Sequence, residues 1–190
     1  QEFLDGLEKY TGEGFLKWNA VEEGDKFGAK VYKISRDGQG SRLTYMKIVS
    51  GTLKVKDILS GRGKDGEAWE EKVNQIRVYS GEKYELVKEA HKGMVCAATG
   101  LNATYPGEGL GIVCASEEPV LEPVLNYQVR LPEGCDIHNM LQNLRQLEEE
   151  DPMLRTTWNE ELGEIHVQLM GEVQTEILQD IIKERFGVEV

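Results

Sequence analysis

Residues 27–57 have the sequence FGAKVYKISRDGQGSRLTYMKIVSGTLKVKD, and this stretch decides the fold of the first half of the chain. Two β-rich runs, 29–34 and 43–49, are separated by the turn Arg36-Asp37-Gly38-Gln39-Gly40. Glycine accepts the positive φ angle that such turns tend to need, so the pattern predicts two strands joined by a turn. The second run is mostly apolar on both faces, which is typical of an interior strand.

The same kind of run recurs after this stretch. Further β-rich segments, separated by breakers such as Ser50-Gly51 and Ser80-Gly81, are found at 53–59, 73–79, 84–87, 94–98 and 111–114. Short strands at close spacing predict a compact β-barrel, which we place at residues 26–118.

Residues 119–190 predict a second domain. Pro119 and Pro123 cannot donate to a sheet, so they mark a hinge. A strand at 124–131 is expected next, and then a helix with Asp136 as its N-cap, which ends at Pro152. Its apolar positions follow helical spacing and are Ile137, Met140, Leu141, Leu144 and Leu147.

The rest of this domain predicts a hairpin, a helix and a short strand. The hairpin strands are 154–158 and 164–169, and the last strand is 188–190. We expect the helix to end at Gly187 and to bury Val173, Ile177, Leu178, Ile181 and Phe186. The order is βαββαβ, typical of ferredoxin-like α+β domains. Residues 1–25 are interpreted as the closing helix of an upstream domain, at 3–10, and a linker.

Charge is distributed unevenly between the two predicted domains. The 190-residue chain carries a net charge of −12, whereas residues 26–92 sum to +6 and residues 120–190 to −10. A basic barrel can neutralise backbone phosphate, so we expect RNA contacts from side chains on its turns and adjacent strands. The candidates are Arg36, Arg42, Lys54, Lys56, Arg62 and Lys64. Tyr32 and Tyr45 could be core residues or base-stacking platforms.

Several classes of function find no support in the sequence. No apolar run is long enough to span a bilayer. Cys96, Cys114 and Cys135 are an odd number without a Cys-x-x-Cys pair, so disulfides and a zinc knuckle are not expected. Cys96 and Cys114 lie in apolar stretches and are predicted to be buried, reduced thiols, which favours a cytoplasmic protein.

The sequence also lacks motifs that are typical of catalysis or of cofactor binding. The three histidines are scattered, and Gly61-Arg62-Gly63-Lys64-Asp65-Gly66 lacks the spacing of a phosphate loop and has no helix after it. The acidic run at 148–151 lies at a helix C-terminus, where the macrodipole disfavours negative charge. A run at a helix end is usually a solvated face, and a surface for a basic partner is the hypothesis that would explain its position. No catalytic residue, metal site or cofactor is predicted in this chain.

Two pairs of segments resemble a known family. Residues 27–34 and 42–57 resemble the second domain of elongation factor G and its relatives. Residues 149–155 and 170–177 resemble the third domain of the same family. The resemblance extends from about Phe27 to Val190 and implies a translation GTPase.

This resemblance implies specific partners. The parent protein would bind GTP with Mg²⁺ in an upstream G domain and would act on the ribosome, together with domains IV and V. The barrel would contact small-subunit ribosomal RNA, and the third domain would lie between the G domain and a small-subunit protein. Met170, Gly171 and Glu172 would relay nucleotide state between domains. The implied protein is a cytoplasmic monomer without membrane or DNA partners.

The resemblance can be narrowed at the start of the second helix. Elongation factor G usually has Gly-Met-Gly-Glu-Leu-His there, whereas this chain has Leu169-Met170-Gly171-Glu172-Val173-Gln174, more similar to the tetracycline-resistance ribosomal protection proteins. The segments 151–155 and 37–41 favour the same branch. Two alternatives stay open: a translocation factor of the elongation factor G type, and a free-standing, non-enzymatic RNA-binding adaptor.

Overall fold

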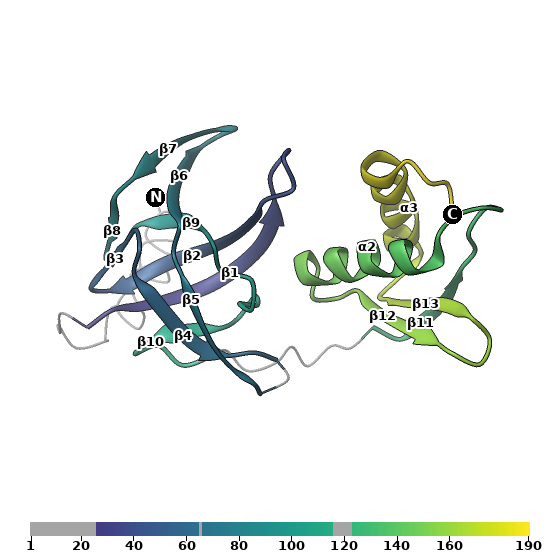
Figure 1. The fold of residues 1–190 in the computed structure, drawn as a ribbon, viewed down its shortest axis with the longest axis horizontal. Coiled ribbons are helices and arrows are strands. Elements are labelled where there is room, and N and C mark those ends of the chain that lie inside the picture. The colour runs from purple at the N-terminus through teal and green to yellow at the C-terminus, as the bar shows by residue number, and fades with distance from the viewer. Residues whose placement is uncertain (1–25, 65, 116–122) are drawn as a thin grey trace, which may run out of the picture. The chain divides into compact units, whose positions relative to one another are not determined.

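The computed structural model describes residues 26–64, 66–115 and 123–190 (Figure 1). These residues divide into two compact units, one before and one after the segment 116–122. The expected helix at 3–10 and the hinge residue Pro119 lie outside the described residues. Within the described part of the chain, no helix has the length and apolarity that crossing a membrane would require.

The first unit is built from strands. A six-stranded sheet has the order β10-β1-β2-β9-β6-β7, and two smaller sheets pair β3 with β8 and β4 with β5 (Figure 1). The strands are β1 (Gly28–Arg36), β2 (Arg42–Ser50), β3 (Thr52–Lys54), β4 (Ile58–Arg62), β5 (Ala68–Lys72), β6 (Gln75–Ser80), β7 (Lys83–Val87), β8 (Glu89–His91), β9 (Val95–Thr99) and β10 (Gly109–Gly111). The prediction of a β-barrel domain is confirmed.

The barrel core follows from alternation along the strands. Val31 and Ile34 of β1 and Met46 and Ile48 of β2 are fully buried, while most of the residues between them lie nearer the surface. The register of β1 and β2 shifts between Val31 and Lys33, which marks a β-bulge at Tyr32. A bulge inserts one extra residue and redirects the side chains beside it.

Two strand predictions in the barrel were wrong. The segment 53–59 is not one strand, because Lys56 has a φ of 78° and turns the chain between β3 and β4. Asp57 stabilises this turn, since its Oδ2 accepts a hydrogen bond of 2.8 Å from the Lys54 backbone N–H. The segment 111–114 is not a strand either. β10 ends at Gly111, and Cys114 is exposed rather than buried.

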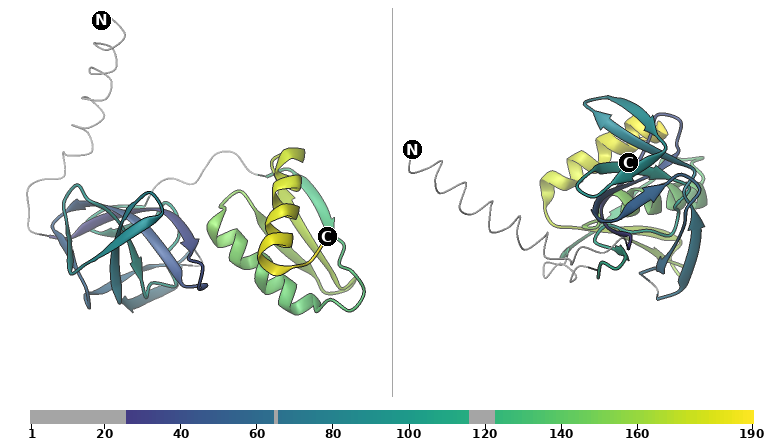
Figure 2. Two further views of the ribbon diagram at one scale, coloured as in Figure 1. Left: turned by 90° about the horizontal axis from the view of Figure 1, so that it is seen from above. Right: turned by 90° about the vertical axis from the view of Figure 1, so that its left-hand side faces the viewer.

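The second unit is an α+β domain, as predicted. Its elements are β11 (Leu125–Val129), α2 (Ile137–Glu150), β12 (Arg155–Asn159), β13 (Glu164–Leu169) and α3 (Glu172–Phe186). The strands form an antiparallel sheet of order β11-β13-β12, and both helices cover one face of it (Figure 2). Asp136 is the N-cap of α2, as predicted: its Oδ1 accepts hydrogen bonds from the backbone N–H groups of His138 and Asn139.

Three details of the second unit differ from prediction. Ile137 is 39% exposed, because it lies in the first turn of α2 at the edge of the apolar face. On α3, Val173 and Ile177 are 71% and 52% exposed, whereas Leu178 and Ile182 are buried. Residues four apart share a helix face, so these two pairs form different faces, and the pattern alone did not say which one packs on the sheet.

The expected strand at 188–190 is also absent. Gly187 ends α3 in the left-handed conformation, and the chain then stays beside the helix. Gln179 Nε2 donates to the Val190 carbonyl oxygen at 3.0 Å, and Lys183 pairs with Glu189. These contacts with α3 side chains replace the strand pairing that was expected.

Candidate functional site

The six predicted RNA-contacting residues lie on three separate turns of the barrel. Arg36 and Arg42 face each other across the β1–β2 turn, Lys54 and Lys56 belong to the β3–β4 turn, and Arg62 and Lys64 lie at the β4–β5 turn. The β1–β2 and β4–β5 turns lie far apart in Figure 1, so the six do not form one cluster. Lys54, Lys56, Arg62 and Lys64 are exposed.

Arg42 is half-buried and bonded to the loop before β10. Its Nη1 donates to the Leu101 carbonyl oxygen at 2.6 Å and to Thr104 Oγ1 at 2.9 Å, and its Nη2 donates to the Thr104 carbonyl oxygen at 2.6 Å. Thr44 Oγ1 and Thr104 Oγ1 are 2.8 Å apart, so the network continues into the buried interior. These bonds tie β2 to the loop before β10, and they occupy most of the guanidinium donors.

Asp37 fixes the β1–β2 turn. Its Oδ1 accepts hydrogen bonds from the backbone N–H groups of Gln39 and Ser41, and its Oδ2 accepts one of 2.9 Å from Arg77 Nη1. The bond from Arg77 and those from the backbone lower the pKa of the Asp37 carboxyl. The turn is therefore positioned by a β6 side chain that is 40 residues away in sequence.

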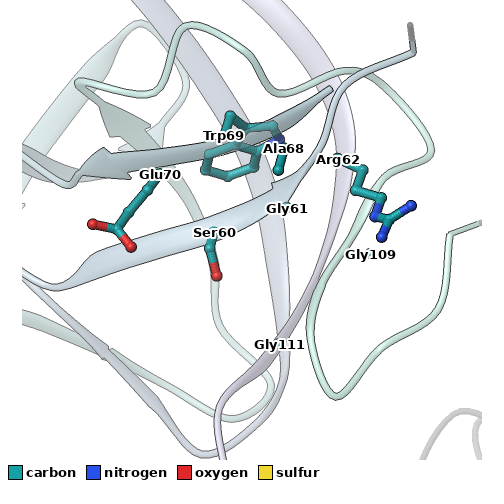
Figure 3. A pocket seen from close by; sticks show the side chains of 8 residues that line it. All are labelled: Ser60, Gly61, Arg62, Ala68, Trp69, Glu70, Gly109 and Gly111. Carbon is teal, nitrogen blue, oxygen red and sulfur yellow. The ribbon is translucent and has the colours of Figure 1, made fainter. Parts of the chain in front are cut away.

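An open pocket of about 520 Å³ lies where the β4–β5 hairpin meets β10 (Figure 3). Trp69 lines this pocket, and its Nε1 donates to Glu108 Oε1 at 3.0 Å; burial raises the pKa of the Glu108 carboxyl. A Cβ on Gly61 would lie 2.5 Å from Glu108 Oε1 and 2.6 Å from the Trp69 ring, so this floor requires glycine. The lining residues are Ser60, Gly61, Arg62, Ala68, Trp69, Glu70, Gly109 and Gly111.

The segment predicted to relay between domains joins β13 to α3. Met170 is 37% exposed, and Gly171 is the N-cap of α3 without a side-chain hydrogen bond. Gln174 holds this corner, because its Oε1 accepts a 2.8 Å bond from the Met170 backbone N–H and its Nε2 donates to Asp151 Oδ2 at 3.2 Å. The corner is thus tied to the end of α2.

Two family models match the two units. One, described as Elongation factor G domain 2, matches residues 26–111, and the other, described as Elongation Factor G, domain III, matches residues 120–190. The chain belongs to the elongation factor G family. The two matches follow each other in the chain, so the barrel is its domain II and the α+β unit is its domain III.

Individual relatives agree with this family. Elongation factor G of Thermotoga petrophila is 29% identical over 187 residues, which are 95% of this chain and 26% of that protein. Elongation factor G of Ureaplasma parvum is 29% identical over 173 residues, 87% of this chain and 24% of that protein. The chain therefore spans about a quarter of the length of these relatives.

A solved structure agrees as well. A crystal structure of a Thermus thermophilus protein superposes with a TM-score of 0.65 at 26% identity, covering 86% of this chain and 25% of that one. This likeness supports a β-barrel followed by an α+β domain.

The acidic run of domain III has hydrogen-bond and ion-pair partners inside the domain, so a basic partner surface is not needed to explain it. Arg185 forms a bidentate ion pair with Glu150, with Nη1–Oε1 at 2.8 Å and Nη2–Oε2 at 3.1 Å. Glu148 Oε2 accepts from the Thr156 backbone N–H, and Asp151 Oδ1 accepts from the Met153 backbone N–H. The run thereby stabilises the junction of α2 with β12 and α3.

The glycine segment at 61–66 is not a phosphate loop. In domain II it joins two strands of a hairpin, β4 and β5, whereas a phosphate loop leads from a strand into a helix. No group of three or more histidine, cysteine, aspartate or glutamate residues that could hold a metal ion is found in residues 26–64, 66–115 and 123–190.

Sequence reasoning missed two features of the surface. Exposed Val173 and Ile177 follow the relay segment on α3, and they give this corner an apolar outer face. The second feature is a row of tyrosines on the outside of the domain II sheet. Tyr32 and Tyr45 were considered individually, whereas they contact each other and the row continues to Tyr79 and Tyr84 on β6 and β7.

Proposed function

We propose that this chain is the ribosome-binding middle part of a translation GTPase, in which domain II contacts small-subunit ribosomal RNA. The observation that supports this most is the set of exposed cations on turns of a domain II barrel: Lys54, Lys56, Arg62 and Lys64. Cations on turns can reach backbone phosphates without any readout of base sequence. GTP and Mg²⁺ would bind elsewhere in the parent protein, in a G domain.

Co-sedimentation with purified small ribosomal subunits over a salt series tests this role. We compare the unmodified chain with K54A/K56A, with R62A/K64A and with the control K72A/K83A, which removes two exposed lysines that are not candidates. Each lost phosphate contact lowers the slope of log affinity against log salt by about 0.7–0.9. A turn variant with an unchanged slope, or no binding even at low salt, would contradict the proposal.

Domain III would transmit the nucleotide state of the G domain to the rest of the protein by docking. The corner made by Met170, Gly171 and Glu172 supports this role, because Gln174 and Asp151 hold it in a fixed conformation beside exposed Val173. The full-length protein and a form without domain III are compared for ribosome-stimulated GTP hydrolysis. Equal rates would refute the relay.

Among translation GTPases we favour a tetracycline-resistance ribosomal protection protein, because the Val173-Gln174 pair resembles that branch of the family. Translocation is the second candidate, since the relatives described above are elongation factors G. Expression of the full-length gene in a tetracycline-sensitive bacterial strain separates the two. A raised inhibitory concentration of tetracycline supports protection, whereas rescue of a strain depleted of its own elongation factor G, without resistance, supports translocation.

A further inference from the structure

Four tyrosines form a continuous row across the outer face of the domain II sheet. The ring centroids of Tyr32 and Tyr45 are 6.2 Å apart, those of Tyr45 and Tyr79 are 5.6 Å apart, and those of Tyr79 and Tyr84 are 5.3 Å apart. Aromatic pairs attract each other at such distances when the rings are tilted, as all three pairs are. The row runs from β1 through β2 and β6 to β7, and we call it the tyrosine face.

The two inner rings of the row are more buried than the two outer ones. Tyr45 and Tyr79 are half-buried, and burial together with a hydrogen bond to Tyr79 raises the pKa of the Tyr45 hydroxyl to about 12. Tyr45 therefore stays neutral under all ordinary conditions. Tyr32 and Tyr84, at the two ends, are 48% and 46% exposed. The bulge in β1 directs Tyr32 outward beside Lys33.

Cations are interleaved with these rings. Lys33 Nζ lies 5.9 Å from the centroid of the Tyr45 ring, and the Arg77 guanidinium carbon lies 4.6 Å from the centroid of the Tyr84 ring. Lys47 follows Tyr45 by two residues in β2, so the two side chains lie on the same face of the sheet. The tyrosine face thus combines aromatic surface with positive charge.

The positions of the nearby carboxylates limit the negative charge beside the tyrosine rings. Asp37 is the carboxylate on Arg77, and it also holds the β1–β2 turn. Glu85 adjoins Tyr84 in β7, but alternation along a strand directs it to the opposite side of the sheet. A ligand that offers flat rings and negative charge together suits this face better than an apolar protein surface does.

We propose that the tyrosine face binds unpaired RNA bases, which stack on Tyr32 and Tyr84 while Lys33 and Lys47 contact the adjoining phosphates. Single-stranded RNA combines aromatic bases with a regular anionic backbone, and stacking platforms flanked by cations are the general means of holding it. This site deepens the proposed RNA contact of domain II: the turns bind phosphate, whereas the tyrosine face binds bases. It rests on the proposed function only in taking RNA as the partner.

The test is an anisotropy titration of the chain with a labelled, unstructured eight-nucleotide RNA. A second RNA of the same length lacks the bases at its four central positions but keeps every phosphate. Stacking on two rings predicts that the intact RNA binds at least ~10-fold more tightly than the abasic one, since each stacked base contributes roughly 5- to 150-fold. Equal affinity for the two RNAs would overturn the proposal.

Matched variants separate stacking from a structural role of the rings. Y32F/Y84F keeps both rings and retains the preference for the intact RNA. Y32L/Y84L keeps apolar side chains but removes the rings, and thermal unfolding measured alongside shows that it is still folded at the temperature of the titration, where it binds both RNAs with the weaker affinity. If Y32L/Y84L binds like the unmodified chain, the rings have no role in binding and the proposal fails.

Two further measurements keep this proposal distinct from the general one. Replacement of uridine by 5-bromouridine allows photo-cross-links, which we expect in peptides that contain Tyr32 or Tyr84. Co-sedimentation with small ribosomal subunits is run in parallel. If the unmodified chain does not bind the oligonucleotide but co-sediments with the subunits through its lysines, the tyrosine face alone is rejected. If the chain binds neither the oligonucleotide nor the subunits, RNA contact by domain II is rejected as well.

Discussion

Domain II and domain III use their charged residues in different ways. In domain II the lysines and arginines of the β3–β4 and β4–β5 turns are exposed, whereas the Arg42 guanidinium is bonded to the Leu101–Thr104 loop. In domain III the acidic run is used for internal contacts, with Arg185, Thr156 and Met153. The net charge of a domain therefore does not indicate which of its charged residues hold it together.

Arg42→Ala should have the largest effect, and it tests whether this domain II cation stabilises the fold from within. Removal of the guanidinium leaves the Leu101 and Thr104 carbonyl oxygens without these donors, so we expect a loss of about 2–3 kcal/mol in the free energy of unfolding. Urea denaturation of domain II measures it, with Lys54→Ala as the exposed control, expected within about 0.5 kcal/mol of the unmodified chain. Equal, small losses in both variants would show that Arg42 stabilises domain II no more than an exposed lysine does.

Arg185→Ala tests the corresponding statement for domain III, with a smaller effect. The Arg185 side chain is 42% exposed, so solvent screens its ion pair with Glu150 and we expect a loss of about 0.5–1 kcal/mol. Thermal unfolding of domain III measures the change, and Glu184→Gln, at an exposed neighbouring position, serves as the control. If Glu184→Gln destabilises the domain as much as Arg185→Ala, general charge rather than the paired geometry accounts for the effect.

The smallest expected effect is a pH dependence in domain II. The pKa of Asp37 is lowered in the folded state, chiefly by the hydrogen bond from Arg77. Its stabilisation is therefore fully present above the unfolded pKa of about 4, and it is lost as the pH falls through the lower folded value. Melting temperatures of the unmodified chain and of Asp37→Asn should differ at neutral pH and converge in acid. A difference in melting temperature that persists at the lowest pH would show that the hydrogen-bond geometry of Asp37, rather than its charge, stabilises the domain.

Much of the fold could be predicted from local patterns, whereas the failures have two different causes. The β1–β2 hairpin and the capped helix α2 follow from neighbouring residues such as Gly40 and Asp136. The turn at Lys56 could not be predicted, because a lysine with positive φ leaves no signal in sequence. The burial of Ile182 instead of Val173 depends on how α3 lies on the sheet, which periodicity does not determine.

The candidate surface was predictable in composition but not in arrangement. Six cations were named correctly as residues of strand ends and turns, yet their separation and the internal bonds of Arg42 required three-dimensional contacts. The tyrosine face could not be found from spacing, because its rings come from four strands that lie up to 52 residues apart, from Tyr32 to Tyr84. A pattern within one strand contains at most one of these rings.

The three thiols of the chain provide a distance gauge between its domains. Cys96 is buried in the barrel, and burial raises its pKa to about 11, so it resists alkylation. Cys114 is exposed in domain II, and Cys135 is partly accessible in domain III. A maleimide donor and acceptor on these two native cysteines would report energy transfer across the interdomain segment without any engineered mutation. The separation of the domains could then be followed in solution, before and after the chain meets a ribosomal subunit.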